Sequence, residues 1–311
     1  MRTVVTLTSV FAVPDAIDCA PPTAVKPKSP ETCAAAKDAA EPTQSFLRWA
    51  GGKRWLLHHL PAVLGSFEIS GYHEPFLGGG ALFFGSIITG EAHLSDLNAD
   101  LIETYIQVRD QPERVANFLE THVNTSEHYY AVRASSPQDP ASRAAKFIYL
   151  NHTSYNGIYR VNLKGQYNVP FGNPTNANLP SPELLASVSR KLQGVTIGAS
   201  DFQGAVEQVR AGDLIFLDPP YTVAHNNNGF IKYNQRLFSF EDQTRLSKLI
   251  DDVRERDAYY LLTNAAHDSI AALFEKGDRR LELTRGNSIG GRKAKRGSAA
   301  EYVFTNACAH G

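Results

Sequence analysis

The chain has 311 residues, of which 42% are hydrophobic, so it can bury a sizeable core as one large domain or as a core with an inserted subdomain. Its formal net charge of −1 excludes a general electrostatic attraction to nucleic acid, so a polyanionic partner needs a local basic patch. The three cysteines have no CxxC spacing and no neighbouring clusters of histidine or acid, which indicates a reducing compartment and no metal site.

Residues 1–44 are predicted to form a disordered N-terminal tail, because residues 20–45 are a low-complexity segment rich in proline, alanine and lysine. The first twenty residues carry one arginine and a mildly apolar run, so a secretory signal peptide is the weaker alternative. No stretch approaches the ~18 consecutive apolar residues of a membrane helix. We therefore expect a cytoplasmic protein without membrane contact.

From Phe46 onward the sequence has the character of a folded α/β domain. Residues 71–88 and 91–110 each read as a short strand, a turn and an apolar helix. The strand pattern resumes in residues 194–202, 212–221 and 258–267, and a helix follows Ser239, which has the capping-box spacing to Asp242. This alternation predicts a parallel sheet covered by helices.

Residues 111–190 differ in kind from the sequence on either side. A helical pattern around residues 142–150 is followed by residues 151–182, which are rich in asparagine, glycine, tyrosine and proline and have hairpin chemistry. We interpret residues 111–190 as an inserted recognition domain between two parts of a catalytic domain, residues 45–110 and 191–311.

Close to the C-terminus a basic turn separates two β-like segments. It contains Arg292, Lys293, Lys295 and Arg296. A solvated hairpin tip is one reading of this turn. The other is a phosphate clamp, which adds affinity for nucleic acid but little specificity.

Two glycine-containing turns suit a nucleoside-like ligand. The turn at residues 78–80 leaves a predicted strand and can bring backbone close to a ligand. Asp96 ends the next strand, where an acid can hydrogen-bond ribose hydroxyls, although a helix N-cap is the alternative. Upstream, Trp49 and Lys53 flank a second glycine pair, which suits a ligand that carries an aromatic ring and a carboxylate.

The tetrapeptide DPPY at residues 218–221 follows an apolar strand, at the edge where open α/β sheets bind ligands. Its prolines fix the backbone, so the carbonyls of Asp218 and Pro219 point in a set direction. Oxygen acceptors there can take both hydrogens of an exocyclic amine and leave its lone pair available. Tyr221 can stack on the attached base, which is worth ~1–3 kcal/mol. The pattern predicts methylation of an amino group on an aromatic base; a proline turn with a solvent-facing aspartate is the alternative.

In this order, the stretches FLRWAGGKR, EPFLGGGALFF, LSDLN, YLNHTSYNGIYRVNLKGQYNVPFG and DPPY resemble the Dam-like DNA adenine-N6 methyltransferases. The resemblance runs from about Phe46 to Asn306. It implies a Rossmann-like sheet that uses S-adenosylmethionine, with an inserted helical and β-hairpin DNA-recognition domain. It also implies direct methyl transfer to N6 of an adenine flipped out of duplex DNA, without a covalent enzyme intermediate and without metal.

The resemblance assigns roles to individual residues. Those implied to contact the cofactor are Trp49, Lys53, Glu74, Gly78, Gly80, Asp96, Asp201, Phe202 and Asp218. Those implied in catalysis are Asp218, Pro219 and Tyr221. Those expected to bind DNA are Tyr155, Asn156, Ile158, Arg160, Pro170, Arg292, Lys293, Lys295 and Arg296.

Within the recognition segment, Tyr155 reads as a wedge on a hairpin tip, with ordinary hairpin packing as the alternative. Arg160 is a candidate bidentate donor to guanine. The loop at residues 222–234 is expected to order over the flipped adenine, with Phe230 and Tyr233 in contact with the base.

The sequence alone leaves other functions possible. An amino-methyltransferase for RNA or protein is one alternative, and a catalytically inactive DNA-binding regulator is another. Cytosine-C5 methylation is excluded because it needs a nucleophilic thiolate, usually after proline, and the chain has no Pro-Cys pair. The resemblance of the hairpin segment to the family favours GATC as the target, and the other sites read by related enzymes stay open as alternatives. We expect a monomer, and a cognate restriction endonuclease is a possible partner.

Overall fold

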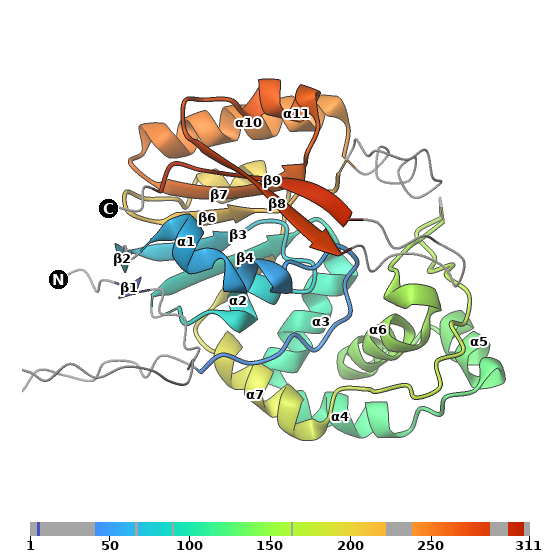
Figure 1. Ribbon diagram of the computed structural model, residues 1–311. Coiled ribbons are helices and arrows are strands. Elements are labelled where there is room, and N and C mark those ends of the chain that lie inside the picture. The colour runs from blue at the N-terminus through green and yellow to red at the C-terminus, as the bar shows by residue number, and fades with distance from the viewer. Residues whose placement is uncertain are drawn as a thin grey trace, which may run out of the picture.

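The computed structural model describes residues 5–6, 41–65, 68–88, 90–162, 164–221, 238–286 and 298–307. Figure 1 shows a twisted sheet beside a group of helices. The sheet has seven strands in the order β5-β4-β3-β6-β7-β9-β8. Their bounds are β3 (Gly71–Glu74), β4 (Glu91–Asp96), β5 (Thr196–Ala199), β6 (Leu214–Leu217), β7 (Tyr259–Ala265), β8 (Arg279–Gly286) and β9 (Ser298–Thr305). The predicted α/β class is therefore confirmed.

The first five strands in this order are parallel, and β9 and β8 complete the sheet in antiparallel pairings. The chain moves outward from β3 to β4 and β5, and then returns to place β6 on the other side of β3. The strand order therefore reverses between β3 and β6, which is where open sheets of this kind bind ligands. A separate two-stranded pairing joins β1 (Val5–Thr6) to β2 (Glu68–Ile69).

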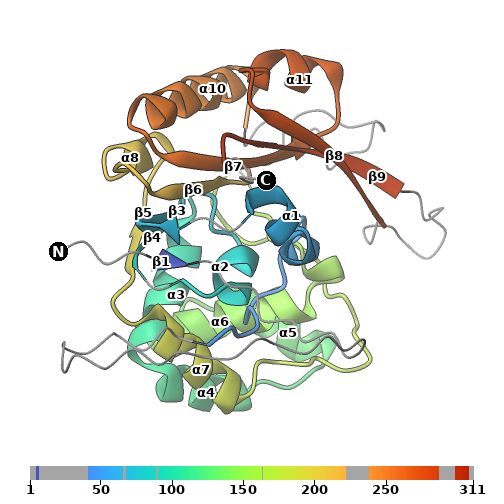
Figure 2. The same ribbon diagram turned by 60° about the vertical axis from the view of Figure 1, so that its left-hand side comes forward.

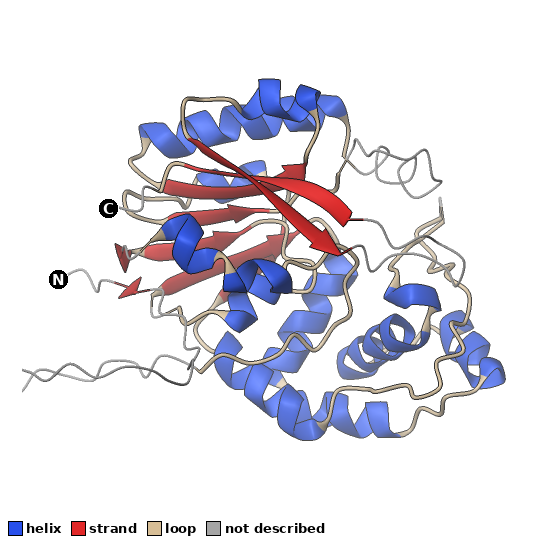
Figure 3. Cartoon of the chain, viewed as in Figure 1, coloured by secondary structure: helices blue, strands red, loops and turns tan. Residues whose placement is uncertain are grey.

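Helices cover both faces of the sheet (Figures 2 and 3). One side carries α10 (Phe240–Glu255) and α11 (Asp268–Phe274), and the opposite side carries α1 (Leu60–Leu64), α2 (Ala81–Gly85) and α3 (Ala99–Asp110). Two shorter elements, η1 (Arg54–His58) and α8 (Gln203–Val206), complete this part. Every residue of β6 is buried, and its side chains alternate between two hydrophobic cores, as expected for a central strand.

The helix after Ser239 has the predicted N-terminus. The Ser239 hydroxyl accepts the Asp242 N–H at 3.1 Å, and the Asp242 carboxylate accepts the Ser239 N–H at 2.8 Å. This reciprocal arrangement is the capping box that the sequence predicts.

The remaining helices form the lower part of the molecule in Figure 1. They are α4 (Pro112–Glu120), α5 (Ser126–Ala134), α6 (Pro140–Thr153), η2 (Tyr155–Gly157) and α7 (Pro182–Leu192). Both α6 and α7 pack on α3 and α4, and one hydrophobic core continues from the sheet into these helices. The bounds of the recognition domain stay a prediction, and α7 runs across its expected end at residue 190.

Tyr155 lies elsewhere in the loop after α6 than the sequence predicted. Isolated bridges pair Ser154 with Phe171 and Val161 with Tyr167, so this loop is closed at residues 154 and 171. It turns where the Gly165 N–H donates to the Asn162 carbonyl. Tyr155 therefore lies at the base of the hairpin-like loop, and its prediction at the tip is wrong. The reason is local: Asn156 and Gly157 both have positive φ and turn the chain directly after α6.

Several predicted features lie outside the described residues. These are nearly all of the expected tail, Phe230 and Tyr233 of the loop after DPPY, and Arg292, Lys293, Lys295 and Arg296 of the basic turn. Within the part of the chain that is described, no helix is long and apolar enough to cross a membrane.

Candidate active site

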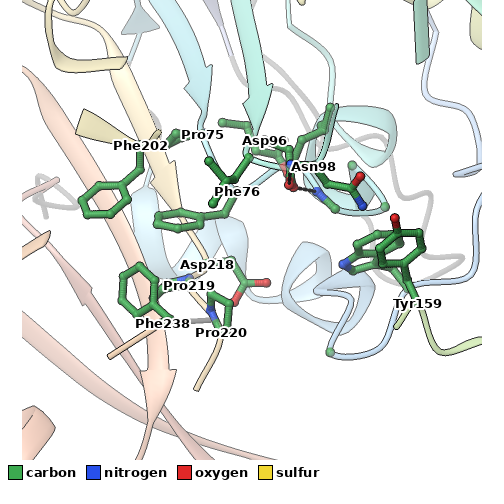
Figure 4. Close-up of a pocket in the computed structure, with 18 of the residues that line it drawn as sticks. Pro75, Phe76, Asp96, Asn98, Tyr159, Phe202, Asp218, Pro219, Pro220 and Phe238 are labelled. Carbon is green, nitrogen blue, oxygen red and sulfur yellow. Dashed lines mark hydrogen bonds between the residues drawn. The ribbon is translucent and has the colours of Figure 1, made fainter. Parts of the chain in front are cut away.

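A cavity of about 810 Å³ opens at the carboxyl ends of β3, β4 and β6, where the strand order reverses (Figure 4). Its walls come mainly from residues 49–53, 74–82, 96–100, 200–202 and 218–221, with Ile158, Tyr159, Val161 and Gly165 from the loop after α6. All of the residues expected to contact a cofactor or to act in catalysis line this one cavity. Of the residues expected to bind DNA, Ile158 also lines this cavity.

The glycine turn after β3 is shaped by Trp49. Gly78 has φ +46°, and a Cβ added to it would lie 2.6 Å from Trp49 Nε1. A Cβ on Gly79 would lie 2.9 Å from Trp49 Cβ. The other face of the indole stacks on Tyr159, with 6.0 Å between ring centroids. Glycine is therefore required here so that the turn can pack against an aromatic ring.

Asp96 ties the end of β4 to this turn. Its carboxylate accepts the Gly78 N–H at 2.9 Å and the Asn98 N–H at 3.0 Å. Burial raises the pKa of Asp96, while these backbone donors lower it. The alternative reading of Asp96 as a helix N-cap is wrong, because the Asn98 side chain caps α3 by accepting the Leu101 N–H.

The far end of the cavity is aromatic. Phe202 stacks on Phe76 with ring centroids 5.3 Å apart, and Phe238 lies 5.6 Å from both rings. Figure 4 shows these three rings together, away from Tyr159. Asp201 is paired with the Arg245 guanidinium at 2.8 Å, and that guanidinium lies 4.8 Å from the centre of the Phe202 ring. Such a surface suits a flat heterocycle.

Glu74 places a second acid in the cavity wall. Its side chain is buried and accepts the Tyr72 hydroxyl at 2.7 Å. Burial is the main cause that raises the pKa of Glu74 to about 8, and the neighbouring Asp218 and Asp96 act in the same direction. A cation brought into this cavity would favour the ionised form of Glu74.

The carboxylate of Asp218 is held by two side chains distant in sequence. Lys53 Nζ lies 2.8 Å from Asp218 Oδ1 and 3.0 Å from Oδ2, and the Thr263 hydroxyl donates to Oδ1 at 2.7 Å. Burial raises the pKa of Asp218, and Lys53 opposes that rise. The alternative of a solvent-facing aspartate is therefore wrong. Lys53, expected to meet a ligand carboxylate, forms an ion pair within the site, and its contact with a ligand stays a prediction.

Tyr221 lies close to Lys53 and is anchored through its hydroxyl group. Its hydroxyl donates to Glu301 Oε2 at 2.8 Å, and Lys53 Nζ lies 5.0 Å from the centre of its ring. Burial raises the pKa of Tyr221 well above its ordinary value, so the hydroxyl keeps its proton and acts as a donor.

Most of the expected DNA-contacting residues of the loop after α6 are exposed. Tyr155, Asn156, Arg160 and Pro170 are exposed, and Ile158 is half-buried. The Arg160 Nε–H donates to Asn168 Oδ1 at 2.7 Å, which fixes the guanidinium across the loop. The Pro170 carbonyl accepts the Tyr155 N–H at 3.0 Å.

Sequence reasoning missed five residues of this site. They are Phe76, Tyr159, Phe238, Thr263 and Glu301. An acid inside the apolar β-like run AAEYVFTN was a signal for Glu301, because charged residues are rarely buried without a partner. A second signal was the position of Phe76, an aromatic residue that directly follows Glu74 and Pro75 at the end of a strand.

Comparison with known proteins agrees with this geometry. The family model described as D12 class N6 adenine-specific DNA methyltransferase matches residues 49–288. The chain is 34% identical over 272 residues to the type II methyltransferase M1.LlaDCHI of Lactococcus lactis subsp. cremoris, covering 84% of this chain and 94% of that protein.

Two further relatives come from distant organisms. The type II methyltransferase M.MjaIII of Methanocaldococcus jannaschii is 35% identical over 252 residues, covering 74% of this chain and 87% of that protein. The DNA adenine methylase of Escherichia coli K12 is 31% identical over 233 residues, covering 73% and 82%. The family model matches well over half of the chain, and the chain therefore belongs to the D12 class of N6 adenine-specific DNA methyltransferases.

Proposed function

We propose that the protein transfers a methyl group from S-adenosylmethionine to N6 of an adenine that is flipped out of duplex DNA, within the sequence GATC. The observation that supports this most strongly is that the DPPY motif and the glycine turn line the same cavity. In that cavity Lys53 and Thr263 hold the Asp218 carboxylate. The relatives named DNA adenine methylase and type II methyltransferase support the same reaction class.

The residues of the cavity fit S-adenosylmethionine. Its volume lies within the ~300–1,000 Å³ typical of small-molecule sites. The rings of Phe202 and Phe76 suit an adenine, and the carboxylate of Asp96, held at a strand end, suits ribose hydroxyls. The Asp218 carboxylate in the cavity wall suits a sulfonium or an ammonium group, and such a cation would favour the ionised form of the neighbouring Glu74.

When bound, S-adenosylmethionine supplies a methyl group activated for attack by a nitrogen lone pair. Asp218 and the Pro219 carbonyl accept the two N6 hydrogens, which makes the amine lone pair available. The methylated nitrogen then loses one proton, for which the Asp218 carboxylate is the acceptor. Lys53 favours the ionised form of that carboxylate, so it is ready to accept. Tyr221 stacks on the adenine ring.

An adenine stacked inside a duplex cannot reach this cavity, so we infer base flipping, which costs a few kcal/mol. The loop that closes at residues 154 and 171 supplies side chains on both sides of the entrance. Ile158 faces the cavity, whereas Tyr155 and Arg160 are exposed. We infer that Tyr155 fills the gap in the duplex and that Arg160 reads a guanine.

A methyl-transfer assay with tritiated S-adenosylmethionine tests this function against its alternatives. We expect label in duplex DNA, at adenine, with little in RNA or protein extract. Equal or greater labelling of RNA or protein would favour an amino-methyltransferase for those substrates. Binding of cofactor and DNA without any label transfer would favour an inactive DNA-binding regulator.

The assembly and partners are also proposals. We propose that the protein acts as a monomer, since one chain supplies every group of the cavity. Relatives named type II methyltransferases support a search for a cognate restriction endonuclease.

A further inference from the structure

Glu301 is a buried carboxylate next to the DPPY motif. It lies at 1% exposure on β9, where it pairs with Ala265 at the end of β7. This antiparallel pairing brings an acid from the last strand to the carboxyl edge of the parallel strands. There its Oε2 accepts the Tyr221 hydroxyl at 2.8 Å and lies 3.8 Å from Lys53 Nζ.

Lys53 lies between two carboxylates in this cluster. Two carboxylates, Asp218 and Glu301, flank one ammonium group, whose Nζ also donates to the Gly51 carbonyl at 2.7 Å. Burying a carboxylate costs several kcal/mol of desolvation, which its partners must offset. Tyr221 and Lys53, both in the cavity wall, are two of these partners of Glu301.

The hydrogen bond between Glu301 and Tyr221 has a geometric consequence. The ring of Tyr221 is fixed at its Cα by the stiff proline pair and at its hydroxyl by a strand from the far end of the sequence. Two fixed ends set the direction of the long axis of the ring. Because a phenolic O–H lies in the plane of its ring, an acceptor held on a strand also restricts rotation of the ring about that axis. Stacking on a base depends on that plane. Lys53 Nζ, 5.0 Å from the centre of the ring and 2.8 Å from Asp218 Oδ1, links the ring to the Asp218 carboxylate.

We propose that Glu301 is a positioning residue for methyl transfer, which sets the plane of Tyr221 and holds Lys53 against Asp218. This inference rests on the proposed function, because the placed groups are those that contact the adenine. Glu301 itself does not touch the substrate. Its loss therefore lowers the rate of the chemical step and leaves the binding of cofactor and DNA nearly unchanged.

The test compares Glu301→Leu with Glu301→Gln. Leucine removes the acceptor and the charge, and we expect the single-turnover rate to fall about 10- to 100-fold, the scale of a misplaced reacting group. Glutamine keeps an oxygen that accepts the Tyr221 hydroxyl, so it should recover part of the rate. Dissociation constants for S-adenosylmethionine and duplex DNA should change little. Glu282→Ala, an exposed acid on the neighbouring strand β8, is the matched control.

A double-mutant cycle with Tyr221→Phe isolates the hydrogen bond. Phenylalanine keeps the ring but has no hydroxyl, so Glu301→Leu should cost less in this background than in the wild type. Equal costs in both backgrounds, a wild-type rate for Glu301→Leu, or a loss confined to DNA affinity would each overturn the proposal. An inactive wild-type protein would instead overturn the function on which it rests. Thermal unfolding of each variant shows that the rates belong to folded protein.

Discussion

At the residue scale, the site depends on a carboxylate whose partners lie far apart in the chain. Asp218 directly follows the fully buried strand β6. Its oxygens contact Lys53, from a loop before β3, and Thr263, on the neighbouring strand β7. Removing one partner of such a pair leaves a buried charge without compensation. Substitutions at these residues should therefore lower the rate of methyl transfer. Substitutions at Lys53 should also lower the stability of the fold.

Asp218→Ala should abolish the acceptor for the N6 hydrogens. We expect methyl transfer to fall by about 100- to 10,000-fold, the range of general-base effects, with much of the DNA affinity kept. Rates on a duplex substrate and gel-shift titrations measure the two quantities. A parallel loss of DNA binding would show that Asp218 acts mainly through structure.

Glu74 gives the folded protein a specific pH dependence. Its pKa is raised to about 8 by burial, so the folded state holds a proton that the unfolded state releases at lower pH. The contribution of Glu74 to stability is therefore greatest below its unfolded pKa and is lost as pH rises towards about 8.

Glu74→Gln removes this titration. Relative to wild type, the variant should become more stable as pH increases from 5 to 9, as followed by thermal unfolding without cofactor. A stability difference that is constant over this range would show that Glu74 does not titrate abnormally.

At the element scale, the glycine turn and its tryptophan form one unit. Gly78→Ala combines a positive φ with a clash against Trp49, and we expect a loss of stability of about 1–3 kcal/mol together with weaker cofactor binding. Urea unfolding and cofactor titration measure both effects.

Gly277→Ala is the control for this substitution. Gly277 also has a positive φ, at +76°, but a Cβ there has nothing within 4 Å. It should therefore show the backbone strain without the clash. The Gly78→Ala penalty should also shrink in a Trp49→Ala background, and an undiminished penalty would show that the indole is not its cause.

The loop closed at residues 154 and 171 should determine sequence preference. Arg160→Ala should relax discrimination at one guanine by about 1–3 kcal/mol, the value of a bidentate contact. Methylation rates on duplexes altered one base pair at a time measure this. Lys164 is an exposed cation at the turn of the same loop. Lys164→Ala should instead lower the affinity for all DNA sequences by the same factor. A uniform loss for Arg160→Ala would contradict its reading role.

At the scale of the whole molecule, the sequence predicted what depends on local patterns. Alternating strands and helices, the capping box at Ser239 and the motif positions around the cavity follow from residues near one another in the chain. Contacts between distant segments could not be read in this way. The pairing of Lys53 with Asp218 and of Tyr221 with Glu301 depends on strand order and on antiparallel register. Tyr155 was misplaced because two residues with positive φ turn the chain immediately after α6.

The measurement that tests the central claim most directly is methylation-sensitive sequencing of DNA from cells that express the protein, beside cells that express Asp218→Ala. We predict N6-methyladenine at one short recurring sequence, GATC, in the first sample and its absence in the second. A different recurring sequence would correct the target alone. No N6-methyladenine, or the same amount with Asp218→Ala, would contradict the assignment of adenine methylation to this site.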